Sequence, residues 1–326
     1  MKMIGDSMPA ISVVIPTYRR THDLRRCLRA LRTQIRAPDE VLLVVRDTDE
    51  ETRSFLEAEP IELSSLRIVA VTEPGQVAAL NAGLRCSSGE IVAITDDDAA
   101  PRSDWLLRIE NHFVQDAALG GIGGRDWIPT ELRRSGFRRA RVGKVQWFGR
   151  VIGNHHLGDG KPRYVDFLKG ANMSYRRTAI EGIRFHTGLK GVGAQVNNDM
   201  EFSMAVKRAG WKLLYDPLVA IDHYPASRFD EDQRHAFNEI AMHNRVHNET
   251  YVLLLNFGAL RRMIFMAWLL TIGTRASPGL LQWVRLLVRE PGLANGKWMA
   301  ALRGTLDGYR AWRACGDNRQ ARKREG

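Results

Sequence analysis

Three consecutive carboxylates, Asp96, Asp97 and Asp98, follow the apolar run Ile91–Thr95. Neighbouring like charges repel one another, so a fold that gathers them at the end of a buried strand gains by holding a cation there. Hard divalent cations prefer carboxylate oxygen. A second interpretation is open, because Asp98 could also cap a helix that begins near Pro101. These residues therefore indicate either a metal site or a helix start.

Two further apolar runs also end in polar residues. Residues 11–16 precede Thr17 and Tyr18, and residues 40–45 precede Arg46 and Asp47. Open α/β sheets bind ligands at the carboxyl ends of their parallel strands, so we expect the three ends to line one crevice. For Asp47 a turn is the alternative, because Asp-Thr-Asp also starts turns and helices.

The elements that must position these side chains are predicted by the first 116 residues, in which short apolar runs alternate with amphipathic stretches. One helical stripe is marked by Leu24, Leu28 and Leu31, and residues 77–84 form another. This pattern is typical of βαβ units and predicts a mostly parallel sheet flanked by helices. The predicted strands are 11–16, 40–45, 67–71 and 91–95.

A second ordered block follows Gly120. It holds residues 164–169 and 170–175, a predicted helix near 198–209 that Gly210 ends, and a predicted strand at 212–215. Beyond residue 229 the sequence looks helical. We therefore expect an α/β domain over residues 1–228, which divides into halves at about residue 119, and a helical C-terminal region over 229–326.

The net charge of +11 is concentrated in two segments of this 326-residue chain. Residues 130–150 hold seven Arg or Lys against one Glu, and residues 303–326 hold seven against three acids. Such blocks suit an anionic partner such as phosphate, nucleic acid or an acidic lipid surface, and a solvated face is the alternative.

Cysteine content and the first residues bear on the compartment. Cys27, Cys86 and Cys315 are odd in number and widely spaced, which favours neither a disulfide framework nor a zinc site. Residues 1–9 contain no apolar run of signal-peptide length. We therefore expect a cytoplasmic protein.

The C-terminal region has apolar runs at 251–255 and 263–273, each shorter than the roughly 20 residues that span a bilayer. Residues 280–288 add Trp283 and Arg285, so that apolar and basic faces alternate. This pattern is typical of a helix that lies in a membrane interface. The alternative is that these helices pack on the catalytic domain or form a dimer contact.

Five motifs in a fixed order make the chain resemble the glycosyltransferases of family 2, which have the GT-A fold and use nucleotide sugars. The resemblance spans roughly residues 11–224. It rests on Val13-Val14-Ile15-Pro16-Thr17-Tyr18, Asn81-Ala82-Gly83-Leu84, Asp96-Asp97-Asp98 with Pro101, Gly170-Ala171-Asn172-Met173-Ser174, and Asn198-Asp199-Met200-Glu201 leading into Arg208-Ala209-Gly210-Trp211. It implies an α/β protein with a mostly parallel central sheet flanked by helices and a helical C-terminal appendage.

The resemblance also implies roles for individual residues. Asp98 would ligate Mg²⁺ or Mn²⁺, and His223 would be a second metal ligand, although a structural role for His223 is equally open. Asp199 matches the general base that deprotonates the acceptor hydroxyl, and a helix cap is its alternative. The residues expected to bind the donor are Pro16, Thr17, Tyr18, Asp47, Asn81, Asp96 and Asn172.

Four positions depart from the family pattern. Arg46 stands where an acid is common and Leu80 where an Arg is frequent. Asn198 stands where the family usually has Glu, and Glu201 where a second Asp is common. The change at Arg46 puts the contact to the nucleotide base in doubt, and the change at Leu80 removes one expected phosphate contact. His155 and His156 lie in a variable region, where we expect a solvated loop.

From this resemblance we expect an inverting, metal-dependent hexosyltransferase that uses a nucleoside diphosphate sugar, with UDP favoured. Residues 1–228 would be its catalytic domain, with a nucleotide-binding half up to about residue 119 and an acceptor half over about 120–228. Its acceptor would be a glycan or a lipid-linked hydroxyl in cell-envelope or extracellular glycan synthesis, reached by peripheral contact with the cytoplasmic face of the membrane, and no nucleic-acid partner is expected. One alternative is a sugar-nucleotide pyrophosphorylase, but residues 16–20 lack the Gly-rich phosphate loop that it would need. Another is a non-enzymatic basic protein that binds nucleic acid or membrane, which the clustered acids oppose.

Overall fold

A computed structural model describes residues 8–59, 63, 65–128, 141–227, 230 and 236–322, with side chains described up to residue 315. Most of the basic segment 130–150 therefore lies outside the described residues. The chain forms two compact units. Unit 1 comprises Met1–Lys144, Gly153–Phe185 and Phe202–Ala226, and unit 2 comprises Val145–Ile152, His186–Glu201 and Ser227–Gly326.

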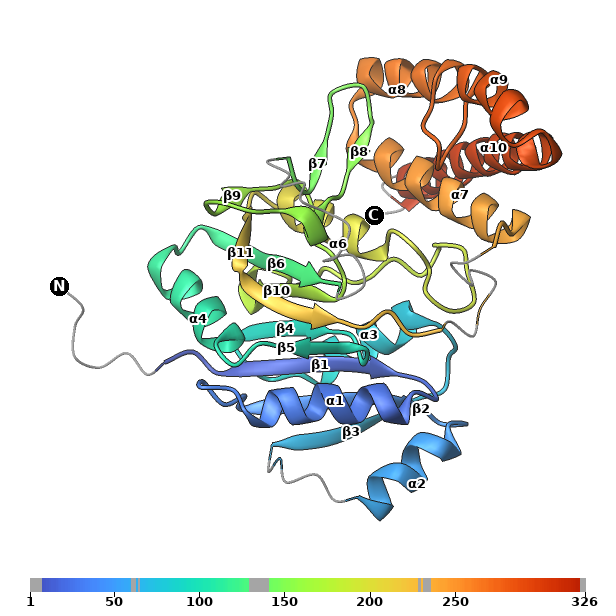
Figure 1. Ribbon diagram of the computed structural model, residues 1–326. Coiled ribbons are helices and arrows are strands. Elements are labelled where there is room, and N and C mark those ends of the chain that lie inside the picture. The colour runs from blue at the N-terminus through green and yellow to red at the C-terminus, as the bar shows by residue number, and fades with distance from the viewer. Residues whose placement is uncertain are drawn as a thin grey trace. The chain divides into compact units, whose positions relative to one another are not determined.

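Unit 1 is built on a mixed sheet in which the described strands follow the order β3-β2-β1-β4-β10-β6-β11-β5 (Figure 1). Strands β1 to β4 are parallel where they pair, β10 runs antiparallel to β4 and β6, and the short β9 pairs with β11. The predicted α/β sheet is confirmed. The strands are β1 Ile11–Thr17, β2 Glu40–Arg46, β3 Leu66–Val71, β4 Ile91–Thr95, β5 Ala99–Pro101, β6 Leu119–Trp127, β9 Arg163–Tyr164, β10 Asn172–Arg176 and β11 Lys212–His223.

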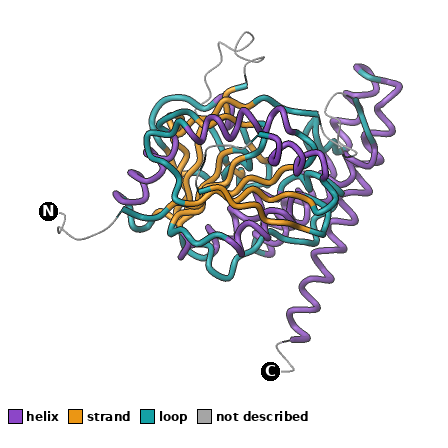
Figure 2. The backbone as a smooth tube through the Cα atoms, turned by 90° about the horizontal axis from the view of Figure 1, so that it is seen from below, coloured by secondary structure: helices purple, strands orange, loops and turns teal. Residues whose placement is uncertain are grey.

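The helices of unit 1 connect and cover these strands. Figure 2 shows the strands as a central layer with helices on either side. The helical elements are α1 Thr21–Arg32, α2 Glu50–Ala58, α3 Gln76–Cys86, α4 Trp105–Gln115, the 3₁₀ turns η1 His155–Leu157 and η2 Arg177–Ala179, and α6 Asn198–Arg208, whose first residues belong to unit 2.

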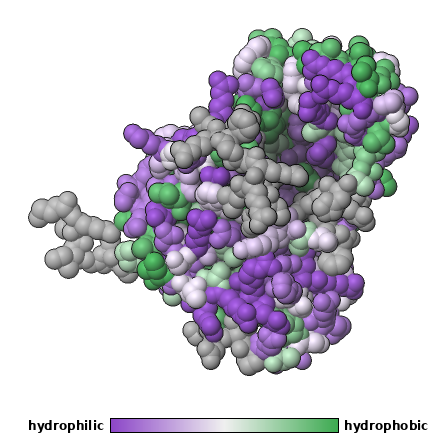
Figure 3. Space-filling view, in the orientation of Figure 1, coloured by the Kyte–Doolittle hydropathy of each residue, from purple (hydrophilic) through white to green (hydrophobic). Residues whose placement is uncertain are grey.

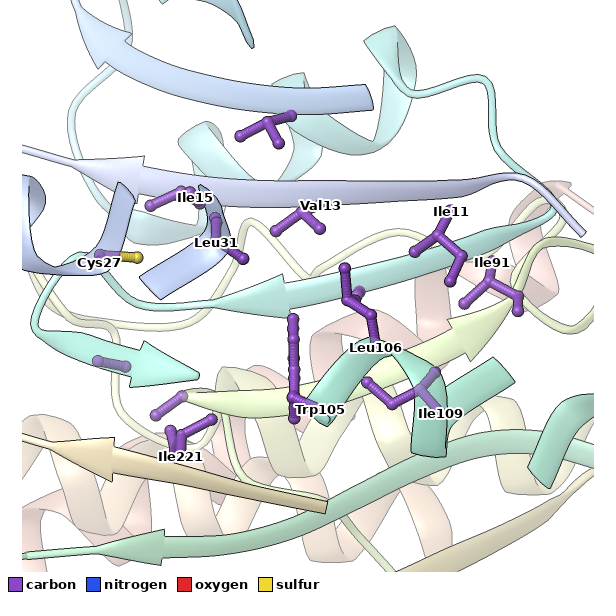
Figure 4. Close-up of a cluster of buried hydrophobic side chains, with 14 of the residues drawn as sticks. Ile11, Val13, Ile15, Cys27, Leu31, Ile91, Trp105, Leu106, Ile109 and Ile221 are labelled. Carbon is purple, nitrogen blue, oxygen red and sulfur yellow. The ribbon is translucent and has the colours of Figure 1, made fainter. Parts of the chain in front are cut away.

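Alternate residues of the central strands supply two cores, because successive side chains of a strand point to opposite faces. In β1, Ile11, Val13 and Ile15 join the core under α1 and α4, whereas Val14 joins the core on the other face. Figure 4 shows Val13 and Ile15 with Leu106 and Trp105 of α4 and Leu31 of α1. Burial on both faces explains why these strands read as continuous apolar runs rather than as alternating ones.

The second core brings α3 very close to the sheet. A Cβ atom on Gly83 would lie 2.3 Å from Val14 Cγ1 and 3.2 Å from Val44 Cγ2, so that only glycine permits this approach. Leu80 is buried in the same core. Leu80, which departs from the family pattern, therefore contributes apolar packing to this core. An Arg at the same position would bring a charged side chain into it.

One sequence prediction fails at an element boundary. The helix expected near Pro101 is absent, because Ala99–Pro101 form β5, and α4 begins only at Trp105 with Asp104 as its N-cap residue. The interpretation of Asp98 as a helix cap is therefore wrong. In the second block, Arg163–Tyr164 form the short strand β9, which pairs with β11.

The described elements of unit 2 are helices and the hairpin of β7, Lys144–Val145, and β8, Val151–Ile152, of which Lys144 belongs to unit 1. Its helices are α7 Glu239–Asn256, α8 Ala259–Thr271, α9 Leu280–Arg289 and α10 Pro291–Arg322. Helices α7 and α10 pack closely, since a Cβ atom on Gly304 would lie 2.6 Å from the His243 carbonyl oxygen. Among the described residues, no helix combines the length and the apolar character needed to cross a bilayer.

Candidate metal and donor site

The acid triplet meets His223 because β5 pairs with the end of β11. Ala99 lies opposite His223 in this antiparallel pairing. The Asp98 carbonyl oxygen then accepts a hydrogen bond from the Tyr224 N–H at 2.9 Å, and Asp98 Oδ2 accepts one from the Ala226 N–H at 2.9 Å. A backbone pairing thus fixes two side chains that are more than a hundred residues apart in sequence.

Asp96, Asp98 and His223 form a cluster that could hold a metal ion. Each offers one ligand atom, and these atoms lie within 4.8 Å of one another. Asp98 and His223 are buried, with exposed fractions of 3% and 6%. His223 Nε2 lies 3.2 Å from Asp98 Oδ1, but among the described residues neither atom has a partner in hydrogen-bond geometry. Two carboxylates and an imidazole fit Mn²⁺ or Mg²⁺, and the unsatisfied buried atoms of Asp98 and His223 are in place to bind it.

Opposite charges perturb the pKa values in this cluster. Burial alone would raise the pKa of Asp98, but the His223 ring, the Ala226 amide and Arg20 lower it to about 2. Burial alone would lower the pKa of His223, but Asp126 and Asp98 raise it to about 9. Burial and the charge on Asp98 raise the pKa of Asp96. The cluster is therefore a place of strongly interacting charges, which is common at functional sites.

Asp126 is a site residue that sequence reasoning did not single out. Its Oδ2 lies 3.6 Å from His223 Nδ1, and it also forms an ion pair with Lys169. Burial would raise the pKa of Asp126, but Lys169 and His223 hold it far below its ordinary value. His223 thus lies between two carboxylates. In the sequence Asp126 is only an acid near the end of an apolar segment. Its importance becomes clear from the sheet order, which places β6 beside β11 and its residue His223.

Asp97, to which the sequence assigned no role, joins the ends of β1 and β4. The Thr17 hydroxyl donates to Asp97 Oδ2 at 2.9 Å, and Arg20 Nη1 donates to Asp97 Oδ1 at 3.0 Å. Burial raises the pKa of Asp97 to about 7, although Arg20 and the Thr17 hydroxyl act in the opposite direction. Arg20 Nη1 also lies 4.0 Å from Asp98 Oδ2. Arg20 therefore balances part of the charge of the triplet.

The other candidates for donor binding surround this cluster at one edge of the sheet. Since β2, β1 and β4 are neighbours and parallel, their carboxyl ends meet at the same edge, as the sequence predicted. Pro16 and Thr17 end β1, and Tyr18 follows with 37% of its surface exposed. Asp47 Oδ1 accepts a hydrogen bond from Arg46 Nε at 3.1 Å. The helix start expected near Asp47 belongs instead to Asp49, which accepts from the Thr52 N–H at 3.1 Å.

Two amide side chains of the expected donor site bind protein groups. The amide of Asn81 exchanges two hydrogen bonds of 2.9 Å with the backbone of Phe185. Asn172 Oδ1 accepts from the Trp105 indole N–H at 2.9 Å, and Asn172 Nδ2 donates to the Val219 carbonyl at 2.7 Å. Both residues are buried. Through these hydrogen bonds, the two side chains link segments that are distant in sequence.

Asp199 lies in unit 2, in the first turn of α6, where its Oδ1 accepts from the Met200 N–H at 2.8 Å. The helix begins one residue earlier, at Asn198, so Asp199 is not its N-cap. The preceding loop has positive φ angles at Gln195 and Asn197, of 43° and 74°, which mark local backbone strain.

The fully buried Asn248 of α7 secures the loop before Asp199. Asn248 Oδ1 accepts from the Lys190 N–H at 2.8 Å, and its Nδ2 donates to the carbonyls of Lys190 and Val196, both at 2.9 Å. One side chain therefore satisfies three backbone groups of this loop. These hydrogen bonds hold the loop in a strained conformation from which it would otherwise relax.

His155 does not lie in a solvated loop, and that prediction is wrong. It starts the 3₁₀ turn η1, is 3% exposed, and has its Nε2 3.2 Å from the Phe167 carbonyl oxygen. Burial lowers the pKa of His155 to about 4, so its ring is neutral at neutral pH. Its partly exposed neighbour His156 accepts a hydrogen bond from Arg125 through its carbonyl oxygen at 2.9 Å.

Known proteins are similar in sequence to this chain. The family model described as glycosyl transferase family 2 matches residues 12–184, more than half of the chain. Glycosyltransferase AglE of Haloferax volcanii is 32% identical over 105 residues, which are 31% of this chain and 34% of AglE. Chondroitin synthase of Escherichia coli is 32% identical over 122 residues, which are 37% of this chain and 18% of the synthase. The chain thus spans about a third or less of the length of these two relatives.

Two solved structures resemble the whole chain. Mannosyltransferase PcManGT from Pyrobaculum calidifontis, in complex with GDP-Man and Mn²⁺, has a TM-score of 0.55 at 19% identity, with 93% of this chain and 88% of that chain covered. TarS of S. aureus in complex with UDP-GlcNAc has a TM-score of 0.50 at 16% identity, with 93% and 92% covered. At these identities the likeness shows the fold. Together with the family match, it establishes that the chain belongs to glycosyl transferase family 2 and has the GT-A fold.

Proposed function

We propose that the protein is an inverting glycosyltransferase that moves a sugar from a nucleoside diphosphate sugar to a hydroxyl. The observation that carries this proposal is the cluster of Asp96, Asp98 and His223 at the carboxyl edge of the sheet in a chain of this family. Transfer from such a donor places new negative charge on the departing diphosphate. An edge that can hold a divalent cation is suited to receive it.

Asp98 and His223 would hold Mg²⁺ or Mn²⁺, with Asp96 on the nucleotide side. When bound, the ion would act as a Lewis acid that neutralises charge on the leaving diphosphate. Asp126 would orient His223 through Nδ1, so that Nε2 faces the ion, as carboxylates behind metal-binding histidines do. Thr17, Tyr18 and Asp47 would line the nucleotide beside this cluster.

Asp199 is our proposed general base. Its carboxylate would take the proton of the acceptor hydroxyl while that oxygen bonds to the anomeric carbon and the bond from that carbon to the diphosphate breaks. Attack opposite the leaving group inverts the configuration. Support comes from the family motif and from the strained loop that Asn248 secures.

The base assignment has a direct test. A positioned general base is worth about 10²- to 10⁴-fold, so Asp199→Asn should lower kcat by that order and leave donor binding unchanged. Asp116→Asn, a carboxylate at the end of α4 in unit 1, is the matched control and should keep its activity. If Asp199→Asn turns over at the rate of the wild type, another residue is the base.

The donor we favour carries UDP, but solved structures of the same fold bind GDP-Man in one case and UDP-GlcNAc in the other. A thermal-shift panel of UDP, GDP and their sugars, each with Mn²⁺, separates these bases. A ligand that binds only the folded state raises the apparent stability, by about 2.7 kcal/mol at a hundred times its Kd. A rise with GDP alone would reject the UDP assignment, and no rise with any nucleotide would oppose the transferase proposal.

For the acceptor we propose a glycan or lipid-linked hydroxyl in cell-envelope or extracellular glycan synthesis, reached by peripheral contact with the cytoplasmic face of the membrane. The net charge of +11 and the amphipathic sequence of α9 support this placement. The family match weighs against both the pyrophosphorylase and the non-enzymatic alternative.

A further inference from the structure

Helices α8 and α9 of unit 2 turn large apolar side chains to the outside. The α8–α9 outer face, as we name this surface, has exposed fractions that reach 71% at Leu260 and 84% at Val288. Figure 3 shows hydrophobic residues gathered over these helices. The face consists of Leu260, Met263, Leu270, Ile272, Leu280, Leu281, Val284, Leu287 and Val288.

The arrangement follows helical spacing in both helices. In α9, Leu280, Val284 and Val288 are exposed at intervals of four residues, whereas Leu286 on the other side is buried. In α8, Met263 and Leu270 are exposed, and Phe265 and Leu269 are buried. An amphipathic helix of a globular protein normally turns its apolar stripe inward. These two helices pack through one side and leave a second apolar stripe uncovered in the part of the chain that the structure describes.

The charge along α8, α9 and the segment that joins them has a single sign. Residues 259–289 contain five Arg and no Asp or Glu. Arg275, Arg285 and Arg289 are exposed. Arg285 and Arg289 follow Leu281 at intervals of four, so that they flank the apolar stripe of α9. Trp283, partly exposed on the same helix, donates its indole N–H to Asn295 at 2.9 Å.

We propose that the α8–α9 outer face docks on a bilayer that contains anionic lipids. Exposed Leu and Val can enter the boundary between head groups and acyl chains, while the arginines that flank them meet lipid phosphates. A second copy of the chain fits poorly, because a two-fold contact through this face would place the arginines of both copies together, whereas the nearest acid in the sequence, Glu290 after the end of α9, is already paired with Lys297. The inference rests on the proposed function in one respect, which is that a glycan-synthesising enzyme works at a membrane. The residues that carry it all lie in unit 2, whereas the metal cluster lies in unit 1.

The test is co-sedimentation of the full chain with vesicles, without donor or acceptor. We expect the wild type to pellet with vesicles of phosphatidylcholine and phosphatidylglycerol, to pellet weakly with phosphatidylcholine alone, and to be released as salt rises, since the Debye length falls from about 10 Å at 0.1 M to about 3 Å at 1 M. The double variant Leu281→Glu/Val288→Glu should lower the partition coefficient at least about tenfold, since it removes two inserting side chains and adds negative charge.

Leu306→Glu is the matched control, because Leu306 is an exposed leucine of α10, 41% exposed and outside the proposed face. It should pellet like the wild type. Circular dichroism and Tm confirm that each variant folds. Vesicle binding that the double variant retains would overturn the proposal, as would a wild type that stays in the supernatant. A solution dimer that the same double variant dissociates, without vesicle binding, would assign the face to a second copy instead.

Failure of the inference is distinguishable from failure of the proposed function. Sugar transfer to a soluble hydroxyl acceptor needs no vesicle and should be unchanged in the double variant. Transfer without vesicle binding would reject the docking face alone, whereas vesicle binding without any transfer would reject the transferase alone.

Discussion

The metal cluster of unit 1 buries charge, whereas the α8–α9 outer face of unit 2 exposes apolar side chains. Asp98 is 3% exposed, and Val288 is 84% exposed. Both depart from the usual distribution of residues between interior and surface. The buried acids, however, meet opposite charge on Arg20 and His223 within the chain. The exposed leucines and valines have no such compensation in the described residues, which is why this surface calls for a partner outside the chain.

Removal of the central acid should produce the largest effect. Asp98→Ala deletes a proposed metal ligand and leaves His223 and Arg20 without their shared partner. We expect loss of Mn²⁺ binding by calorimetry and a fall in transfer of at least about 10²-fold, while vesicle binding stays intact. Asp222→Asn, which changes a neighbouring acid paired with Arg102, should retain both activities. Full activity of Asp98→Ala, or indifference of the wild type to EDTA, would remove the metal from the comparison.

Substitutions on opposite sides of α8 should separate folding from docking. Phe265 is buried, so Phe265→Ala should lower the free energy of unfolding by about 3–5 kcal/mol. Met263 is 70% exposed, so Met263→Ala should change it by no more than about 0.5 kcal/mol and yet weaken vesicle binding. Urea denaturation measures the first effect and co-sedimentation the second. Equal destabilisation by the two changes would mean that the outer face is part of a core.

Asp126 should matter to metal affinity more than to folding. Asp126→Asn removes the negative charge that faces His223 Nδ1 but keeps the shape of the side chain. Carboxylates in this position are worth about 10- to 100-fold in metal affinity, and we expect a loss of that size for Mn²⁺ by calorimetry. Thermal unfolding without metal shows whether the fold is intact. An unchanged Kd would leave Asp126 as a partner of Lys169 only.

The smallest effect is a pH dependence of stability outside both surfaces. His112 Nε2 lies 2.8 Å from Asp216 Oδ2, and despite burial this contact and the Leu218 amide lower the pKa of Asp216. A carboxyl with a lowered folded pKa stabilises above its unfolded value of about 4 and loses that contribution as pH falls through the folded pKa. Wild type should therefore exceed Asp216→Asn in stability near neutral pH, and the gap should narrow below about pH 4. A gap that is constant with pH in denaturant titrations would contradict this.

Local sequence determined the first four parallel strands of unit 1, the helical stripe of α1 and the position of the acids. Strand β4 has the predicted bounds, and the stripe of Leu24, Leu28 and Leu31 is buried in α1 as expected. The strand ends that carry Thr17, Asp47 and Asp96 meet at one edge, since parallel neighbours must place their carboxyl ends together. Periodicity and strand direction are properties that a short stretch of chain carries by itself.

Only the tertiary structure decided which residues complete the site and which side of a helix is outside. Ala99–Pro101 look like the start of a helix, but pairing with β11 makes them a strand and sets His223 beside Asp98. Asp126 gains its role from the same sheet. In α9 the sequence shows an apolar and a basic face. In the structure Leu286 is buried, whereas Val284 and Val288 are exposed, so much of the apolar face points outward. A local pattern creates faces, and long-range packing chooses among them, because burial depends on what the rest of the chain brings alongside.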